Sequence, residues 1–250
     1  GSNISIVTGS NGSVEISAAA GTPSRVVALD SNDIIVWALD EHSAPWTDSV
    51  NGVNLIVSSN PGAGFVGGNS IFGDGCVATS FGASSWLEGS NTTIGENSAG
   101  TIHGWLFWEG YPGGGCGGII SKSNGVSTPS LSMYFDGSGT QDLGLIVKVG
   151  DATGTAVPAG TSYKNFQKGR WNHAALTWDS IGNVKAYING IDVLPSPLTY
   201  TTLGWDGGAW RIGVSFYTGG VSQAHFRDWR VCNVARSQSY LDRKSTRLNS

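Results

Sequence analysis

The chain is poor in charge, and this absence removes several classes of partner. Only 13% of the 250 residues are Asp, Glu, Lys or Arg, and the net charge is −4. An acidic balance without a basic patch of interleaved aromatics disfavours nucleic acid and anionic membranes as main partners. No apolar run approaches the roughly 20 residues that a membrane span needs, so no membrane insertion is expected.

Cysteine is equally scarce. The three cysteines, Cys76, Cys116 and Cys232, stand at irregular spacings that fit neither a disulfide framework nor a zinc site. We therefore expect buried or incidental thiols, and the sequence leaves open a Cys76–Cys116 bridge.

Glycine and tryptophan, in contrast, are abundant. The chain has 38 Gly and 10 Trp, and its apolar runs are short and separated by Gly, Asn, Asp and Ser. Helical periodicity is nearly absent. This pattern predicts an all-β sandwich or barrel of about a dozen short strands, with tryptophan supplying much of the buried area.

The clearest local signal is the segment Gly169–Asp192. Trp171–Trp178 alternates bulky and small residues as a strand does, and the turn residues Ser180–Asn183 follow it. Val184–Ile188 predicts a second strand, and Asn189-Gly190 is a strong hairpin signal before the next short strand, Ile191–Leu194.

This hairpin and its neighbours resemble the laminin-G-like domains of the concanavalin A-like lectin and glucanase superfamily. The other segments that carry the resemblance, in chain order, are Trp37–Leu55, Gly67–Trp86, Thr101–Trp108, Ile119–Lys122, Leu131–Phe135, Leu143–Val149, Trp210–Gly213 and Phe226–Ala235, with a helical turn at Arg236–Leu241. The resemblance implies a two-sheet antiparallel jelly-roll β-sandwich over residues 32–241. Residues 1–31 are expected to be an extension, a linker or an edge strand. Residues 242–250, DRKSTRLNS, look like a translated sequencing adapter, and we exclude them from fold expectations.

Because glucanases share this fold, an enzyme of this type would carry paired carboxylates on its strands. A retaining glycosidase needs two carboxyl groups about 5–5.5 Å apart, hence acids two or four residues apart on one strand face. Glu109 and Asp179 each stand alone at a strand end, and His42, His103, His173 and His225 are dispersed. His173 is expected to be a packed sheet residue. We predict a protein that is not an enzyme, with glycoside hydrolysis as the least favoured alternative.

Binding of a glycan would use aromatic faces beside hydrogen-bonding groups. The aromatics in or next to Gly-rich loops are the candidates: Trp108, Tyr111, Trp205 and Trp210, followed by Trp46 and Tyr217. The alternative for each is packing against its own loop. Trp37, Trp171 and Trp178 are expected in the core or framework.

The resemblance also implies a structural Ca²⁺. Its ligands would be the closing-strand acid Asp228 and the loop acids Asp40, Asp48 or Glu41, because calcium takes six to eight oxygen ligands. The alternatives are that Asp228 pairs with Arg227 or Arg230, and that Asp40 and Asp48 cap turns.

We therefore expect a non-catalytic module that binds a carbohydrate or cell-surface glycan. It would belong to a larger phage tail or fibre protein or a bacterial surface adhesin, on a virion or outside the cell, with assembly through the parent protein left open. The runner-up is a purely structural or decoration domain.

Overall fold

The structure is a computed structural model of the chain. It describes residues 4–8, 14–18, 29–39, 45–59, 66–67, 77–78, 85–110, 115–123, 130–137, 144–157, 166, 169–214 and 223–246. The chain divides into two compact units, Gly1–Asp30 and Ser31–Ser250. The first contains an antiparallel hairpin of β1 (Ile4–Thr8) and β2 (Val14–Ala18).

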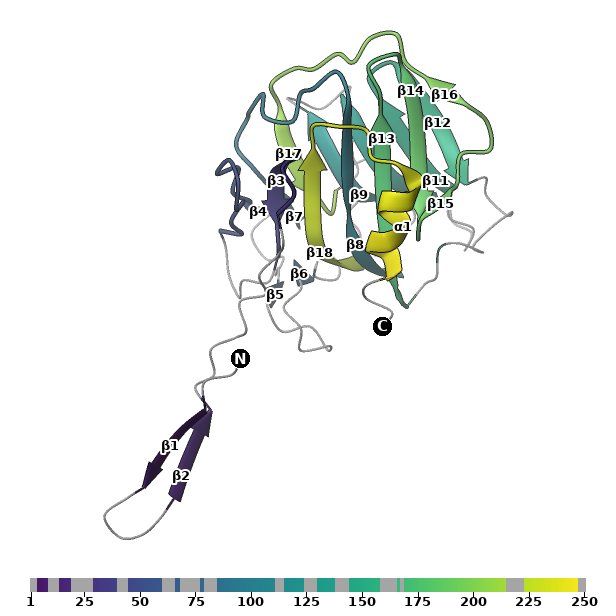
Figure 1. Cartoon of the computed structure of the whole chain (residues 1–250). Helices are drawn as coiled ribbons and strands as arrows, with labels where there is room; N and C mark the ends of the chain where they lie inside the picture. The colour runs from purple at the N-terminus through teal and green to yellow at the C-terminus, as the bar shows by residue number, and fades with distance from the viewer. Residues whose placement is uncertain are drawn as a thin grey trace. The chain divides into compact units, whose positions relative to one another are not determined.

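The second unit contains two antiparallel sheets (Figure 1). Sheet I has the strand order β12–β11–β10–β9–β17–β7–β4. Its strands are β4 (Ile56–Ser59), β7 (Ser85–Glu88), β9 (Gly115–Ser123), β10 (Leu131–Gly137), β11 (Gly144–Val149), β12 (Ala152–Val157) and β17 (Ala209–Ile212). The predicted all-β class with two antiparallel sheets is confirmed.

Sheet II has the order β15–β14–β13–β8–β18–β6–β5, with β16 beside β14 and β3 beside β18. Its strands are β3 (Asp33–Trp37), β5 (Val66–Gly67), β6 (Val77–Ala78), β8 (Gly100–Gly110), β13 (Trp171–Trp178), β14 (Asn183–Ile188), β15 (Ile191–Asp192), β16 (Leu198–Thr199) and β18 (Gln223–Cys232). The predicted hairpin is β13–β14, and Asn189 and Gly190 take φ values of 51° and 79° at its far end. Two consecutive positive φ values are what a type I′ turn requires, and Asn-Gly adopts them readily.

The helix α1 (Gln238–Thr246) packs on sheet II against β13 and β15. Leu241 is fully buried there with Ala175 and Tyr187. The helical turn expected at 236–241 thus begins later and continues to Thr246. Residues 242–246, which we had excluded from fold expectations, are part of this helix.

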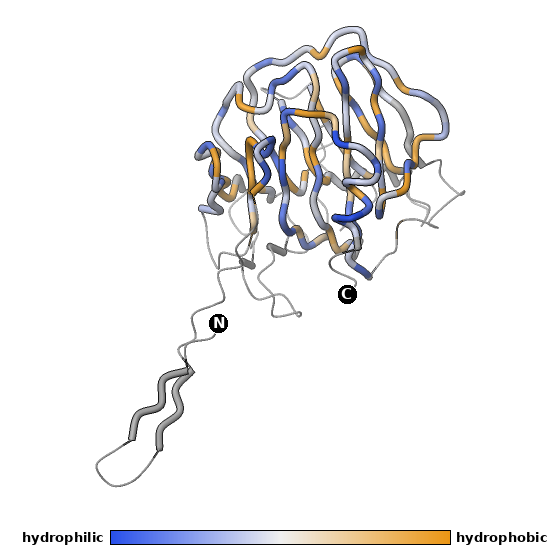
Figure 2. Tube along the Cα trace, in the orientation of Figure 1, coloured by the Kyte–Doolittle hydropathy of each residue, from blue (hydrophilic) through white to orange (hydrophobic). Residues whose placement is uncertain are grey.

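The core fills the space between the sheets, and apolar residues recur along the strands that enclose it (Figure 2). Trp37 of sheet II meets Trp210 of sheet I edge to face, with ring centroids 6.4 Å apart. On β8 the residues Leu106 and Trp108 point into this core, whereas Phe107 does not belong to it. Strand alternation therefore gives sheet II an outer face of its own composition.

A β-bulge in β18 controls which residues reach that outer face. Arg227 pairs with Trp105 and Arg230 pairs with His103, so Asp228 and Trp229 together oppose Gly104. Asp228 has a φ of 48°, a left-handed conformation that is uncommon outside glycine. Since Trp229 turns inward, its indole lies over Gly104, where a Cβ would come within 2.3 Å of the ring.

Gly104→Ala is expected to destabilise the domain, because the new methyl group would displace the Trp229 indole. Overpacking of this kind costs about 1–3 kcal/mol. Urea denaturation of the variant and of Gly89→Ala makes the comparison, since a Cβ at Gly89 meets its nearest atom at 3.3 Å. Equal stabilities of the two variants would contradict this account of the bulge.

Candidate functional site

The outer face of sheet II presents three rings in one row, which we call the outer aromatic row: Trp171, Phe107 and His225. Register places the three residues side by side on β13, β8 and β18. Phe107 contacts Trp171 at 5.9 Å and His225 at 5.6 Å between ring centroids, both edge to face. Trp171 and Phe107 are half-buried, and His225 is 8% exposed. The row is therefore packed on its inner side and partly open to solvent.

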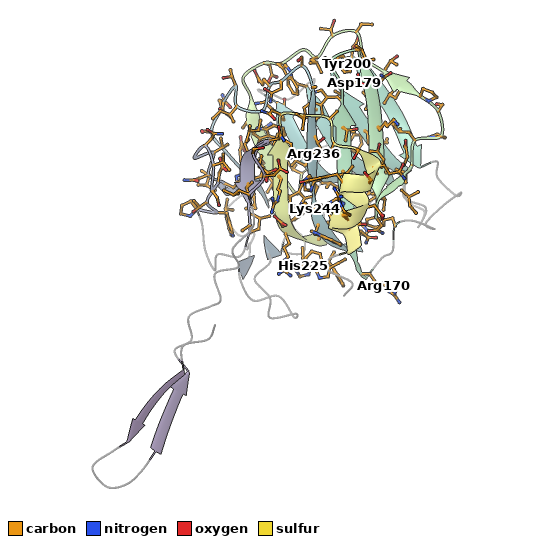
Figure 3. The ribbon with its side chains drawn as sticks, in the orientation of Figure 1. Arg170, Asp179, Tyr200, His225, Arg236 and Lys244 are labelled. Carbon is orange, nitrogen blue, oxygen red and sulfur yellow. The ribbon has the colours of Figure 1, made fainter. Side chains whose placement is uncertain are left out.

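Two arginines lie near this row. Arg170 immediately precedes Trp171 and is exposed, and Arg227 lies on the outer face two residues after His225. Figure 3 shows Arg170 and His225 at one end of sheet II, with Lys244 on the neighbouring helix. Aromatic rings beside guanidinium groups are typical of surfaces that bind polar ligands.

Further along the same strands, His103 of β8 and His173 of β13 form a buried histidine pair. His103 Nδ1 and His173 Nε2 are 3.2 Å apart, and the pair meets Tyr240 of α1 and Trp105 of β8 edge to face. His103 and His173 are 2% and 1% exposed, as expected for His173. Burial lowers the pKa of His173 to about 3, an effect that Asp228 opposes. The pKa of His103 also lies well below its usual value, first through burial and then through the nearby His173, Arg230 and Lys244.

Acid should therefore unfold the domain by protonating this pair. In the unfolded chain each histidine binds a proton near pH 6.5, whereas in the folded protein His173 stays neutral down to about pH 3. Their stabilising contribution is complete above pH 6.5 and is lost as the pH falls towards 3, by up to about 1.4 kcal/mol per pH unit for each histidine. Urea denaturation at pH 7.5 and pH 5.0 measures the loss. His103→Asn should reduce it by about half, and an unchanged pH dependence would contradict this role.

The loop tryptophan Trp205 is half-buried at the other end of the sandwich. Its ring meets Trp178 edge to face at 5.9 Å, and its Nε1 donates to the carbonyl of Asn97 at 3.3 Å. The same loop is held by the Glu96 carboxylate, which accepts from the backbone N–H of Gly207 at 2.7 Å. Trp205 thus keeps part of its surface in solvent while its indole N–H is used by the fold.

Two other predicted ligand-binding tryptophans lie inside the core, which corrects the expectation for them. Trp108 is 1% exposed and packs on Phe135 at 4.5 Å. Trp210 is fully buried, and its Nε1 donates to the carbonyl of Ile94 at 3.1 Å. A ring with no exposed face cannot stack on a sugar. Trp46 is buried as well, and Tyr111 and Tyr217 lie outside the described residues.

Lys122 explains why Trp210 is held so deeply. Its ammonium group is buried, donates to the carbonyls of Thr92 at 2.6 Å and Gly208 at 2.7 Å, and lies 5.3 Å from the Trp210 ring centre. Burial lowers the pKa of Lys122, and the ion pair with Glu96 at 3.3 Å opposes that shift. This lysine ties the loops at either side of Trp210 together instead of facing a ligand.

The acids predicted to bind calcium have structural partners. Asp48 is 4% exposed and accepts four backbone N–H groups, from Val36, Val50, Asn51 and Val53, at 2.8–3.0 Å. Asp228 accepts from Nε of Arg230 at 2.9 Å, one of the alternatives expected for it. Asp40 lies outside the described residues. Within the described part of the chain, no three His, Cys, Asp or Glu side chains gather as a metal site. Calcium binding stays a prediction.

Asp48 allows that prediction to be tested. Asp48→Asn should cost about 3 kcal/mol, because the amide that replaces the carboxylate cannot accept all four N–H groups. The melting temperature should fall equally in calcium and in EDTA if Asp48 only closes its loop. Asp192→Asn, which removes a charge from an exposed turn acid, is the control. A calcium-dependent rise in the wild-type melting temperature that Asp228→Ala abolishes would instead support the calcium site.

Other carboxylates of the described sheets are similarly engaged. Asp33 and Asp228 accept from Nη1 and Nε of the same guanidinium, Arg230, which lies between them. Glu88 pairs with Arg211 at 3.0 Å. Cys232, whose pKa burial raises to about 12, donates to Asp33 at 3.2 Å as a buried free thiol. These contacts hold strands together.

Two antiparallel sheets packed face to face, with the closing strand β18 beside β8, define a jelly-roll β-sandwich. The chain belongs to the family Laminin_G_3, described as the concanavalin A-like lectin/glucanases superfamily, whose model matches residues 81–241. The family resemblance drawn from the sequence is thus confirmed. No curated protein matches the chain in sequence.

Solved structures share the fold at low identity. Trypanosoma rangeli sialidase has a TM-score of 0.62 at 11% identity, covering 88% of this chain and 33% of the sialidase. Domain 4 of AbnA, a GH43 extracellular arabinanase from Geobacillus stearothermophilus in complex with arabinotriose, has a TM-score of 0.59 at 16% identity, covering 86% and 98%. The binding domain of botulinum neurotoxin DC in complex with rat synaptotagmin II has 0.60 at 15%, covering 87% and 52%.

These neighbours include parts of enzymes and binding domains, and such identities show the fold alone. The chain spans about a third of the length of the sialidase. Among the described residues, the single helix is not of a length or hydrophobicity that could cross a membrane.

Proposed function

We propose that this domain is a non-catalytic glycan-binding module and that its binding surface is the outer aromatic row. The observation that carries the proposal is the half-buried pair Trp171 and Phe107, fixed edge to face on adjacent strands. Rings held in this way lose little entropy when a sugar packs on them, and they lie next to hydrogen-bonding side chains.

A domain of the same fold supports the proposal. Domain 4 of the Geobacillus arabinanase is in complex with arabinotriose, and this chain covers nearly all of it. Among the described residues, Asp33, Asp48, Asp228 and Glu88 are held in structural contacts, which supports binding over hydrolysis because a glycosidase needs a free acid and base flanking the bond. The parent protein, a phage tail or bacterial surface protein, is part of the proposal and is tested by the genes that neighbour this one.

Trp171→Ala should weaken glycan binding about tenfold. The measurement is a glycan array followed by titration calorimetry on the best ligand, with melting temperatures to confirm folding. Ile181→Ala is the control, because Ile181 is 84% exposed in the turn between β13 and β14, away from the row.

Two results would overturn this placement. If Trp205→Ala abolished binding while Trp171→Ala did not, the loop at the other end of the sandwich would be the site. A wild-type protein that binds no glycan and forms a stable oligomer would favour the structural or decoration role.

A further inference from the structure

We propose that the outer face of sheet I carries a binding site for an oxyanion group, that is, a carboxylate, sulfate or phosphate. The site consists of Lys148, Ser132 and Ser121, which we call the sheet I polar row. It lies on the other sheet from the outer aromatic row and does not depend on the proposed function.

Strand register places the three side chains of the sheet I polar row side by side. Ser132 of β10 lies opposite both Lys148 of β11 and Ser121 of β9. The strand neighbours Met133 and Val147 belong to the core, so alternation directs the row to the outer face of the sheet. Residues opposite each other on neighbouring strands have Cβ atoms about 4.5–5.5 Å apart. One bound group can therefore accept hydrogen bonds from more than one member of the row.

The polar atoms of this row are buried without partners. Ser121 and Ser132 are each 1% exposed, and neither Oγ has a hydrogen-bond partner among the described residues. Lys148 is 7% exposed and forms no hydrogen bond or ion pair with another described residue. Burying polar groups in this way costs free energy, and a buried charge costs more than a hydroxyl. A bound anion would satisfy all three groups at once.

Other buried cations of the described sheets are compensated. Lys122 forms an ion pair with Glu96 at 3.3 Å, and Arg230 forms one with Asp33 at 2.8 Å. The ion pair of Lys122 opposes the effect of burial on its pKa. Burial also lowers the pKa of Lys148, and no described carboxylate opposes that shift. Lys148 is therefore the cation for which a counter-ion from outside the chain has most to offer.

Two further acids stand near the row in the chain. Asp151, three residues after Lys148, accepts from two backbone N–H groups just after β16, at 2.8 and 3.1 Å. Asp136 shares a face of β10 with Ser132 but follows it by four residues, or about 13 Å along the strand. One acid is thus engaged by the backbone, and the other is separated from the row by strand length.

The row is closed at one end and open at the other. At the closed end Arg211 of β17 lies opposite Ser121 and pairs with Glu88 at 3.0 Å. At the open end Lys148 lies opposite Thr153 of the edge strand β12, and Thr153 is exposed. An anion would therefore approach Lys148 from the β12 edge.

An oxyanion suits this combination of groups better than a neutral ligand does. A water molecule or a sugar hydroxyl can bond to the serines, but it leaves the charge of the buried ammonium uncompensated. A carboxylate, sulfate or phosphate supplies both the opposite charge and at least two acceptor oxygens.

The experiment titrates the protein with phosphate, sulfate and acetate against chloride at constant ionic strength, and follows the backbone amide NMR signals of the row. We expect at least one oxyanion to bind with a Kd of about 1 mM or below, and Lys148→Met to weaken that binding about tenfold. Binding should also weaken as the pH rises, because burial lowers the pKa of Lys148 and the neutral amine no longer attracts an anion. Galacturonate and galactose 6-sulfate, titrated beside the simple ions, distinguish an oxyanion carried by a sugar from a free one.

Two controls separate binding from a structural role of the lysine. Lys185→Met removes an exposed cation from β14 of the other sheet and should leave the affinity unchanged. Without added oxyanion, Lys148→Met should melt no lower than the wild type, because it removes a buried charge that has no partner. Added oxyanion should then raise the melting temperature of the wild type more than that of Lys148→Met.

Three results would overturn the inference. No saturable shift up to about 50 mM of any oxyanion would mean that the buried serines hold water only. Binding that persists unchanged in Lys148→Met would indicate an adventitious ion only, bound elsewhere. A Lys148→Met variant that melts well below the wild type without oxyanion would assign the lysine a structural role. Since Trp171→Ala tests the glycan surface on the other sheet, either proposal can fail while the other stands.

Discussion

The close packing of Trp229 on Gly104 is the constraint on which sheet II depends. The indole fills the space that a side chain at Gly104 of β8 would occupy, and its Nε1 donates to the Trp105 carbonyl at 3.1 Å. To bring Trp229 there, β18 must place two residues opposite one, and Asp228 takes the left-handed conformation that this bulge needs. Because β8 and β18 carry both core residues and outer-face residues, the contact of Trp229 with Gly104 determines which residues of β18 lie beside which residues of β8 on each face.

The bulge also determines what the surface contains. In an unbroken strand, His225 and Arg227 would share a face with Trp229, and that indole would point to solvent. The extra residue shifts the alternation, so that His225, Arg227 and Arg230 all face outward while Phe226 and Trp229 face the core. Arg230 then forms ion pairs with both Asp33 of β3 and Asp228, and these ion pairs link β3 to β18.

The sequence predicts the strands better than the faces they present. The Trp171–Trp178 strand and the Asn189-Gly190 turn are confirmed, because alternation and turn chemistry are local properties. The orientation of Trp105 and Trp108 is not local: Trp108 packs across the sandwich on Phe135 of β10, whereas Trp105 meets His173 on the outer face of sheet II. Trp171 was consequently expected in the framework, although it is half-exposed. The signal that could have revealed the row is the sequence Phe226–Arg230, where the apolar residues are three apart instead of two.

The tryptophans in Gly-rich loops explain why we propose a sheet face, and not these loops, as the binding surface. Trp210 and Trp205 donate their indole N–H groups to loop carbonyls, and Lys122 links the same loops by its own hydrogen bonds. These loops contain little regular pairing, so tryptophan and lysine supply the contacts that hold them on the sandwich. Much of the ring surface of these tryptophans is therefore taken up by contacts within the fold. On the outer face of sheet II the backbone ladder between β13 and β8 holds the strands together, and Trp171 and Phe107, which lie opposite each other on these strands, stay only half-buried.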